Sequence, residues 1–274
     1  MTCLNCGTPV EPADERCPTC GAFLAAQRQA PAGAAVAPVW AAQAWAPVPV
    51  RFAALRGLGT SAAVAVAVVS AVALATIAVD VDRIHVLGAI QDAGSTEGLL
   101  DRADRSDTLV QAFGFTHSAL FLGAVVLFLV WLHRAYGNAI ALGSQLDFTP
   151  GWAVGWWFVP FVNLVRPKRV VDQLWQASQP SVTPGNPVSW MAVPRTGVVP
   201  VWWGLYLGAS VVGSIATRTA GQTVESLRSE AIADLTSNLL EAGSGAALVY
   251  LVWEITRLQS GRVDALTAPP PAAP

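Results

Sequence analysis

The chain has 274 residues, of which 53% are hydrophobic and only 12% are charged, and its formal net charge is −2 at pH 7. A soluble domain usually carries about one quarter charged residues, so lipid must replace water as the solvent around much of this surface. A net charge near zero lacks the electrostatic signature of a nucleic-acid-binding protein, and we expect no nucleic-acid partner.

The first twenty residues contain every cysteine of the chain, in two CxxC pairs that are each followed by glycine: Cys3, Cys6, Cys17 and Cys20. Two residues between paired cysteines let both thiolates reach one tetrahedral ion, so the spacing predicts a four-thiolate zinc site. Four protein ligands fill the coordination shell, which makes the predicted Zn²⁺ structural rather than catalytic. A dithiol redox pair and two disulfides are the alternatives, although a redox CxxC normally begins a helix in a βαβ domain.

Residues 1–24 are therefore predicted to be a small zinc ribbon, and residues 25–50 an Ala/Pro-rich disordered linker. The chain opens with polar, cysteine-bearing residues instead of the basic and apolar regions of a signal peptide. Clustered thiols suit a reducing cytosol, which predicts a cytoplasmic amino terminus. Lys168 is the only lysine, whereas arginine is frequent. This bias in residue usage is typical of a GC-rich bacterial genome.

Four long apolar segments follow and are predicted to cross the membrane: Leu58–Val79, Phe113–Leu132, Val198–Thr217 and Leu239–Ile255. The first measures roughly 33 Å as a helix, enough for a hydrocarbon core of about 30 Å. Residues 51–262 thus form a predicted multi-span membrane domain, and residues 263–274 a disordered tail. The predicted fold class is an all-α integral membrane helical bundle with an amino-terminal zinc ribbon.

The two segments between paired spans, 80–110 and 218–238, mix acidic residues with arginines. The first is predicted to form short amphipathic helices lying over the outer face, with a solvated charged surface rather than a cation site. His117 is interpreted as an interfacial residue, with a proton-sensitive group as the alternative. Glu254 in the last turn of its span is explained by an ion pair with Arg257, three residues further along the same helix, or by snorkelling to the interface.

The stretch Gly151–Val165 would measure only about 22 Å as a helix, and Pro160 should break it. Basic residues precede and follow it, so a re-entrant or interfacial hairpin is preferred to a fifth span. Its tryptophans are predicted to anchor it near the headgroups, and Asn163 to stabilise its backbone. The helix that follows is predicted to lie on the membrane surface.

A basic cluster, Arg166, Lys168 and Arg169, comes directly after this stretch. The main interpretation is that these charges determine topology, and anionic lipid binding is the alternative. Basic residues are more frequent at the proposed inner ends of the spans than at the outer ends. This distribution predicts four spans in a bacterial cell membrane with both termini in the cytoplasm.

The run GWAVGWWFVPFVNLVRPKRVVDQLW, together with the preceding WLHRAYGNAIALG and the terminal EITRLQ, resembles the bacterial membrane proteins of domain-of-unknown-function family 4328. The resemblance covers residues 51 to 262. The amino-terminal cysteine pairs look like zinc ribbons fused to other bacterial membrane proteins. Both resemblances imply an architecture, and neither implies an activity or catalytic residues.

A non-enzymatic membrane protein is the leading hypothesis, with the zinc ribbon docking a cytoplasmic protein partner or serving in sensing. The alternative is a transporter or lipid-handling protein that uses the broken helix around Pro160. An enzyme is disfavoured because the sequence shows no HExxH, phosphate loop or Ser/His/acid constellation.

Overall fold

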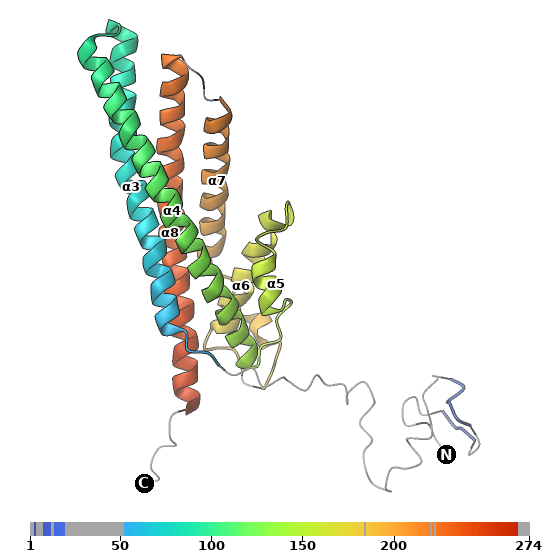
Figure 1. Ribbon diagram of the computed structural model, residues 1–274. Coiled ribbons are helices and arrows are strands. Elements are labelled where there is room, and N and C mark those ends of the chain that lie inside the picture. Colours follow the sequence, from blue (N-terminus) through green and yellow to red (C-terminus); the bar gives the residue numbers. More distant parts are fainter. Residues whose placement is uncertain are drawn as a thin grey trace, which may run out of the picture. The chain divides into compact units, whose positions relative to one another are not determined.

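The computed structural model describes residues 3, 8–11, 14–19, 52–183, 185–219, 221 and 223–267. The chain divides into two compact units, Met1–Pro49 and Val50–Pro274. The predicted linker at 25–50, and two of the predicted zinc ligands, Cys6 and Cys20, lie outside the described residues. In the second unit, four helices are long and apolar enough to cross a membrane (Figure 1).

The first two long helices, α3 (Arg56–Ala93) and α4 (Glu97–Ala141), form a helical hairpin. Gly94 closes α3 with φ 80, a left-handed conformation that glycine adopts without steric cost, and its amide donates to the Ile90 carbonyl at 3.0 Å. With 38 residues, α3 is about 57 Å long, nearly twice the thickness of a hydrocarbon core.

The prediction of short amphipathic helices over residues 80–110 was therefore wrong. These residues continue the two long helices, and only the turn at 94–96 interrupts them. The charged side chains are compatible with a helix and pair across the hairpin: Arg102 donates to Asp82 at 2.7 Å, and Arg83 lies 3.4 Å from Asp107. These ion pairs join α3 to α4, so the charged side chains are accommodated on two long helices rather than on short surface helices.

The second pair of long helices is α7 (Val198–Thr219) and α8 (Val224–Thr267). The charged segment 218–238, predicted to lie outside the membrane, mostly forms the first turns of α8. This helix also runs past the predicted end of its span and includes the first residues of the predicted tail, up to Thr267. Residues 268–274 lie outside the described part.

Helix α8 packs along both α3 and α7, and α4 packs against α3 (Figure 1). Small residues allow the closest approaches. A Cβ atom at Gly59 would lie 2.3 Å from Oγ1 of Thr256, and one at Gly245 would lie 1.9 Å from Oγ of Ser70. The contact at Gly59 involves three atoms of the branched Thr256 side chain and therefore needs glycine, whereas at Gly245 the Ser70 hydroxyl can rotate away. We call the end of the bundle where α3 begins the hairpin end, and the end with the 94–96 turn the far end.

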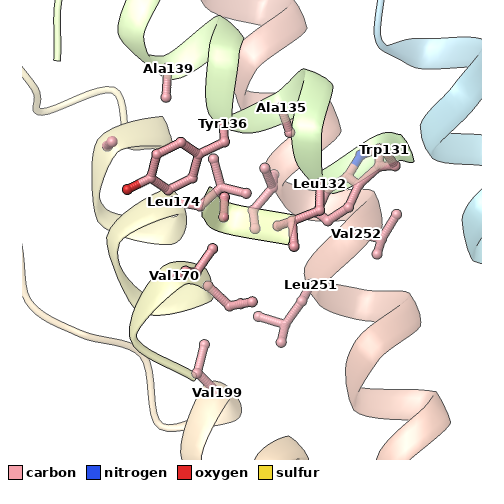
Figure 2. Packing of buried hydrophobic residues seen from close by; sticks show 14 of the residues in the cluster. Trp131, Leu132, Ala135, Tyr136, Ala139, Val170, Leu174, Val199, Leu251 and Val252 are labelled. Carbon is pink, nitrogen blue, oxygen red and sulfur yellow. The ribbon is translucent and has the colours of Figure 1, made fainter. Parts of the chain in front are cut away.

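The main core lies at the hairpin end, where α4, α7 and α8 meet α6 (Arg166–Ser178). Figure 2 shows Leu132 and Tyr136 of α4 on the side of Val170 and Leu174 of α6, and Trp131 on the side of Val252 of α8. Several polar groups within this core form hydrogen bonds, although Gln259 Oε1 and the Nε1 atoms of Trp156 and Trp157 are buried without a partner among the described residues. The Tyr136 hydroxyl donates to Gln173 Oε1 at 2.9 Å, and Gln259 donates to the Ala135 carbonyl at 3.0 Å.

Helix α6 was predicted to lie on the membrane surface with one polar face open, and this is wrong. Its apolar residues are buried, but so are Asp172, Gln173 and Gln176 on the other face. The polar side chains find partners inside the protein: Gln173 donates to Asp147 Oδ2 at 2.6 Å, and Gln176 donates to the Val193 carbonyl. A polar helix face can be buried where such partners satisfy it.

Residues 150–165, which we call the central hairpin, do not form a spanning helix. They comprise α5 (Pro150–Gly155), a series of turns, and the 3-10 helix η1 (Val162–Leu164). The segments on either side are joined: Gln145 N donates to the Pro187 carbonyl at 2.8 Å, and Trp190 Nε1 donates to the Gln145 carbonyl at 2.9 Å. The chain therefore returns to the end of the bundle from which it departed, as the preferred interpretation expected.

Candidate functional site

A cavity of about 840 Å³ lies among the four long helices. Its back is formed by α3 and α8, its sides by α4 and α7, and its floor by the central hairpin. Apolar side chains dominate the lining, among them Val66, Val69, Phe121, Val125, Phe128 and Leu248. Cavities of this size hold small organic ligands in proteins.

Two ionisable side chains from different helices meet in the wall of this cavity. His117 of α4 and Glu241 of α8 are joined by a hydrogen bond of 2.9 Å between Nε2 and Oε1. The side chains are 23% and 25% exposed, so the pair is accessible from the cavity. The His117 ring also stacks on Phe121, with 6.1 Å between the ring centroids.

The sequence interpretation of His117 as an interfacial residue identified no partner for it, and Glu241 had no assigned role. These two residues are 124 positions apart. Neither lies in a recognisable motif, so only the packing of α4 with α8 reveals the pair. The sequence did contain one indication of this site, a histidine and a glutamate within otherwise apolar predicted spans. Ionisable residues within membrane spans usually mark functional positions.

The remaining polar groups of the wall are mainly hydroxyls that donate to backbone carbonyls of their own helix: Ser70 to Val66, Ser118 to Gly114, Ser210 to Tyr206, Ser214 to Ser210 and Thr217 to Gly213. Two further serines of α8 donate to carbonyls of α7, Ser237 to Ala209 and Ser244 to Trp202. Such bonds satisfy a hydroxyl proton in an apolar environment.

The floor of the cavity depends on the tight turns of the central hairpin. Thr149 caps α5 by accepting a hydrogen bond from Trp152 N at 3.3 Å. Phe161 has φ 63 and ψ −39, and Val162 N donates to the Pro160 carbonyl at 2.7 Å, which is the pattern of a γ-turn. Pro160 thus breaks the segment as predicted, and the turn directs the chain back toward α6.

Asn163 takes part in this hairpin through its backbone, since its amide donates to the Val159 carbonyl at 2.9 Å. Its side chain forms no hydrogen bond with another described residue. Neither Asn163 nor Pro160 lines the cavity. The hairpin contributes Trp157 and Phe158 instead.

The hairpin tryptophans were predicted to be headgroup anchors, and they divide into two kinds. Trp152 is 51% exposed and is compatible with that role. Trp157 faces the protein: its ring lies 5.4 Å from that of Phe128 and 5.9 Å from that of Trp203, between centroids. Trp157, which forms part of the cavity floor, thus packs against aromatic residues of α4 and α7.

The basic cluster after the hairpin is largely engaged within the protein. Lys168 pairs with Asp172 at 2.7 Å, and Arg169 pairs with Asp147. Arg166 lies over the rings of Phe148 and Trp156, at 5.5 and 5.4 Å from their centroids. Among the three, only Arg166 lacks a carboxylate partner in the part of the chain described.

The predicted zinc ligands are half described. Cys3 and Cys17 are both buried and lie with Val10 in one small cluster, and Cys3 N donates to the Thr8 carbonyl at 2.9 Å. One cysteine from each predicted CxxC pair thus lies in the same cluster, and the donor chemistry of four thiolates would fit Zn²⁺. Elsewhere among the described residues, no three His, Cys, Asp or Glu side chains are grouped to hold a metal.

Comparison with known proteins gives one result. A family model described as a domain of unknown function, DUF4328, matches residues 95–257, more than half of the chain. The match includes α4, the central hairpin, α6 and α7, and most of α8, but not α3. No curated protein and no solved structure matches the chain.

Proposed function

We propose that this chain, which belongs to the DUF4328 family of domains of unknown function, is a multi-pass membrane protein that binds a lipid-like molecule in the cavity between α3, α4, α7 and α8. The cavity itself is the observation that carries the proposal. Its walls are helices that are apolar enough to lie in a bilayer, so a ligand that reaches it from the lipid needs an apolar body.

The geometry favours this lipid-handling hypothesis over the hypothesis of a pure interaction protein. A protein that only docks partners has no need of a large cavity inside its membrane domain. The wall of the cavity contains the His117–Glu241 pair. A gap left by imperfect packing of apolar helices would have no ionisable side chains in its wall. Ionisable groups within apolar membrane helices are costly and usually mark functional positions, so a functional role accounts for the presence of this pair.

A cavity-filling substitution tests the proposal. Ser210→Phe on α7 places a large ring into the cavity at an exposed position, so it should not disturb the packed core. We expect lipid that co-purifies with the full chain, measured by mass spectrometry, to fall about tenfold, equivalent to roughly 1.4 kcal/mol of binding free energy.

Val211→Phe is the matched control. Val211 is the next residue of the same helix, is 57% exposed and does not line the cavity. Its substitution should leave the retained lipid as in the wild type. If both variants retain the wild-type amount, the cavity does not bind lipid and the proposal is wrong.

A docking role for the amino-terminal unit is a second candidate, favoured by the burial of Cys3 and Cys17 in one cluster. In this proposal a structural Zn²⁺ bound by four thiolates folds a ribbon that contacts a cytoplasmic protein. Cys17→Ser should abolish zinc binding, measured by elemental analysis of the purified chain, because a three-thiolate site loses much of its affinity.

Crosslinked co-purification from native membranes then tests the docking itself. Partners that are captured by the wild type and lost with Cys17→Ser, at equal membrane insertion, support a docking ribbon. A partner set that does not change with loss of zinc contradicts it.

The proposal also includes a bacterial cell membrane, with the hairpin end of the bundle on the cytoplasmic side, and a binding role rather than catalysis. Anionic lipid contact at the basic cluster is confined in this proposal to Arg166, because Lys168 and Arg169 already pair with carboxylates.

A further inference from the structure

The hydroxyls and the carboxylate of the cavity lining present acceptors rather than donors, and Trp157 Nε1 is a donor of the lining that is buried without a partner among the described residues. The hydroxyls on α3, α4, α7 and α8, apart from that of Tyr206, already donate their single protons to backbone carbonyls. What they present to the cavity is therefore their lone pairs. An ionised Glu241 likewise only accepts hydrogen bonds.

The charges in the lining have the same bias. No lysine or arginine is among the residues that line the cavity, and His117, Tyr206 and Glu241 are its ionisable members. His117 can be cationic only when it is protonated, and then it is already paired with Glu241 at 2.9 Å. A phosphate or carboxylate head group would thus meet many acceptors and no available cation.

We infer, on the basis of the proposed function, that the cavity selects a long-chain amphiphile with a cationic head group that donates hydrogen bonds, and that Glu241 binds this head group. An alkylammonium has three donors and no acceptor, the complement of this lining. Its chain would lie along the apolar walls above Trp157 and Phe158. The ammonium would replace the imidazole as the partner of the Glu241 carboxylate.

Competition between the ligand and His117 makes binding depend on pH. Protonated His117 neutralises Glu241, whereas neutral His117 leaves the carboxylate charge available to the ligand. Tyr206 of α7 is the other ionisable group facing the cavity, and the residues contributed by α3 and the central hairpin do not ionise. Affinity for an alkylammonium should therefore rise between about pH 5 and about pH 8.

The experiment uses the full chain in lipid nanodiscs and three photoreactive probes with one diazirine-bearing twelve-carbon chain: a primary amine, an alcohol and a carboxylic acid. Mass spectrometry locates the crosslinked peptides, and the labelling of lipid-facing residues such as Val64 and Leu74 corrects for partition into the bilayer. We expect the amine to label the cavity helices at a concentration about tenfold lower than the acid.

Glu241→Gln removes the charge at constant size and should weaken amine labelling about tenfold while leaving alcohol labelling within about threefold, which also shows that the variant is folded. Glu254→Gln is the matched control, because Glu254 is on the same helix, pairs with Arg257 and is not in the cavity. In His117→Gln the rise of amine labelling with pH should disappear.

The outcomes separate this inference from the function on which it rests. Equal labelling of the cavity by amine, alcohol and acid, or an amine preference that survives Glu241→Gln, overturns the head-group inference but leaves a lipid-binding cavity. Absence of cavity labelling by all three probes overturns both.

Discussion

At the scale of single residues, hydrogen bonds from side chains of α4 connect the residues before α3 to the rest of the bundle. Asn138 of α4 is 2% exposed, accepts a hydrogen bond from Ala53 N and donates one to the Ala53 carbonyl, both at 2.9 Å. One side chain thus satisfies both backbone groups of a residue that precedes α3. Arg134 adds a bond to the Ala54 carbonyl at 3.1 Å.

Asn138→Ala should lower the free energy of unfolding by about 2–4 kcal/mol, because both Ala53 groups lose their partner. Unfolding in mixed micelles with increasing SDS, followed by tryptophan fluorescence, measures the change. Asn186→Ala is the control, since Asn186 also accepts a backbone hydrogen bond but is exposed in a loop. Its effect should stay below about 0.5 kcal/mol. Equal effects of the two substitutions would contradict the role of Asn138.

Two acidic residues of α8 show what could be predicted at this scale. Glu254 and Arg257 are three residues apart on one helix, and their predicted pair is confirmed, with Arg257 Nε donating to Glu254 at 2.8 Å. Helix geometry alone brings such residues together. Glu241 pairs instead with a residue of another helix, and no local periodicity contains that information.

At the scale of elements, the close packing of α3 on α8 depends on glycine. Thr256, which a Cβ atom at Gly59 would strike, is held by two hydrogen bonds. Its hydroxyl donates to the Val252 carbonyl at 2.6 Å and accepts from Trp131 Nε1 at 3.0 Å. Rotation of Thr256 would break this arrangement, so the helices must separate to admit a larger residue.

Gly59→Ala should therefore destabilise the chain by about 1–3 kcal/mol, the usual cost of overpacking a close contact. Gly57→Ala, two residues earlier, is the control because a Cβ atom at Gly57 meets nothing within 4 Å. This control should be neutral or stabilising by up to about 1 kcal/mol, since alanine favours the helix. The same SDS titration measures both. A harmless Gly59→Ala would show that α3 and α8 can move apart freely.

At the scale of the membrane domain, the connections determine which loops share a side of the bilayer. Helix α3 runs from the hairpin end to the far end, α4 returns, and the central hairpin stays at the hairpin end before α7 and α8 repeat the path (Figure 1). The hydrogen bonds between Gln145 and the segment 187–190 close this arrangement. If the four long helices cross the bilayer, this path places residues 145 and 186 on one side and the 94–96 turn on the other.

Impermeant maleimide labelling of single cysteines, in a chain without the four native ones, tests this topology. Gln145→Cys and Asn186→Cys should react from the same side of the membrane, and Ser95→Cys from the opposite side. In the proposed orientation only Ser95→Cys reacts in intact cells. If Gln145→Cys and Asn186→Cys react from opposite sides, residues 151–165 cross the membrane.

Features that depend on neighbouring residues could be predicted from the sequence. Long apolar runs predicted the four spans, and Pro160 with the short apolar stretch around it predicted a broken hairpin in place of a fifth span. These are local properties, because a helix in lipid must satisfy its own backbone hydrogen bonds. The zinc site at Cys3, Cys6, Cys17 and Cys20 belongs to the same class and stays a prediction.

Contacts between side chains of different helices could not be predicted from the sequence and became visible in the packed bundle. The polar face of α6 is buried because its side chains bond to Asp147 and to the Val193 carbonyl. The charged segments continue the long helices, with an ion pair between α3 and α4. In the cavity wall, His117 pairs with Glu241 of another helix. The physical reason is that packing fixes the rotation of each helix about its axis. Apolar composition, which is similar on all sides of these spans, does not specify that rotation.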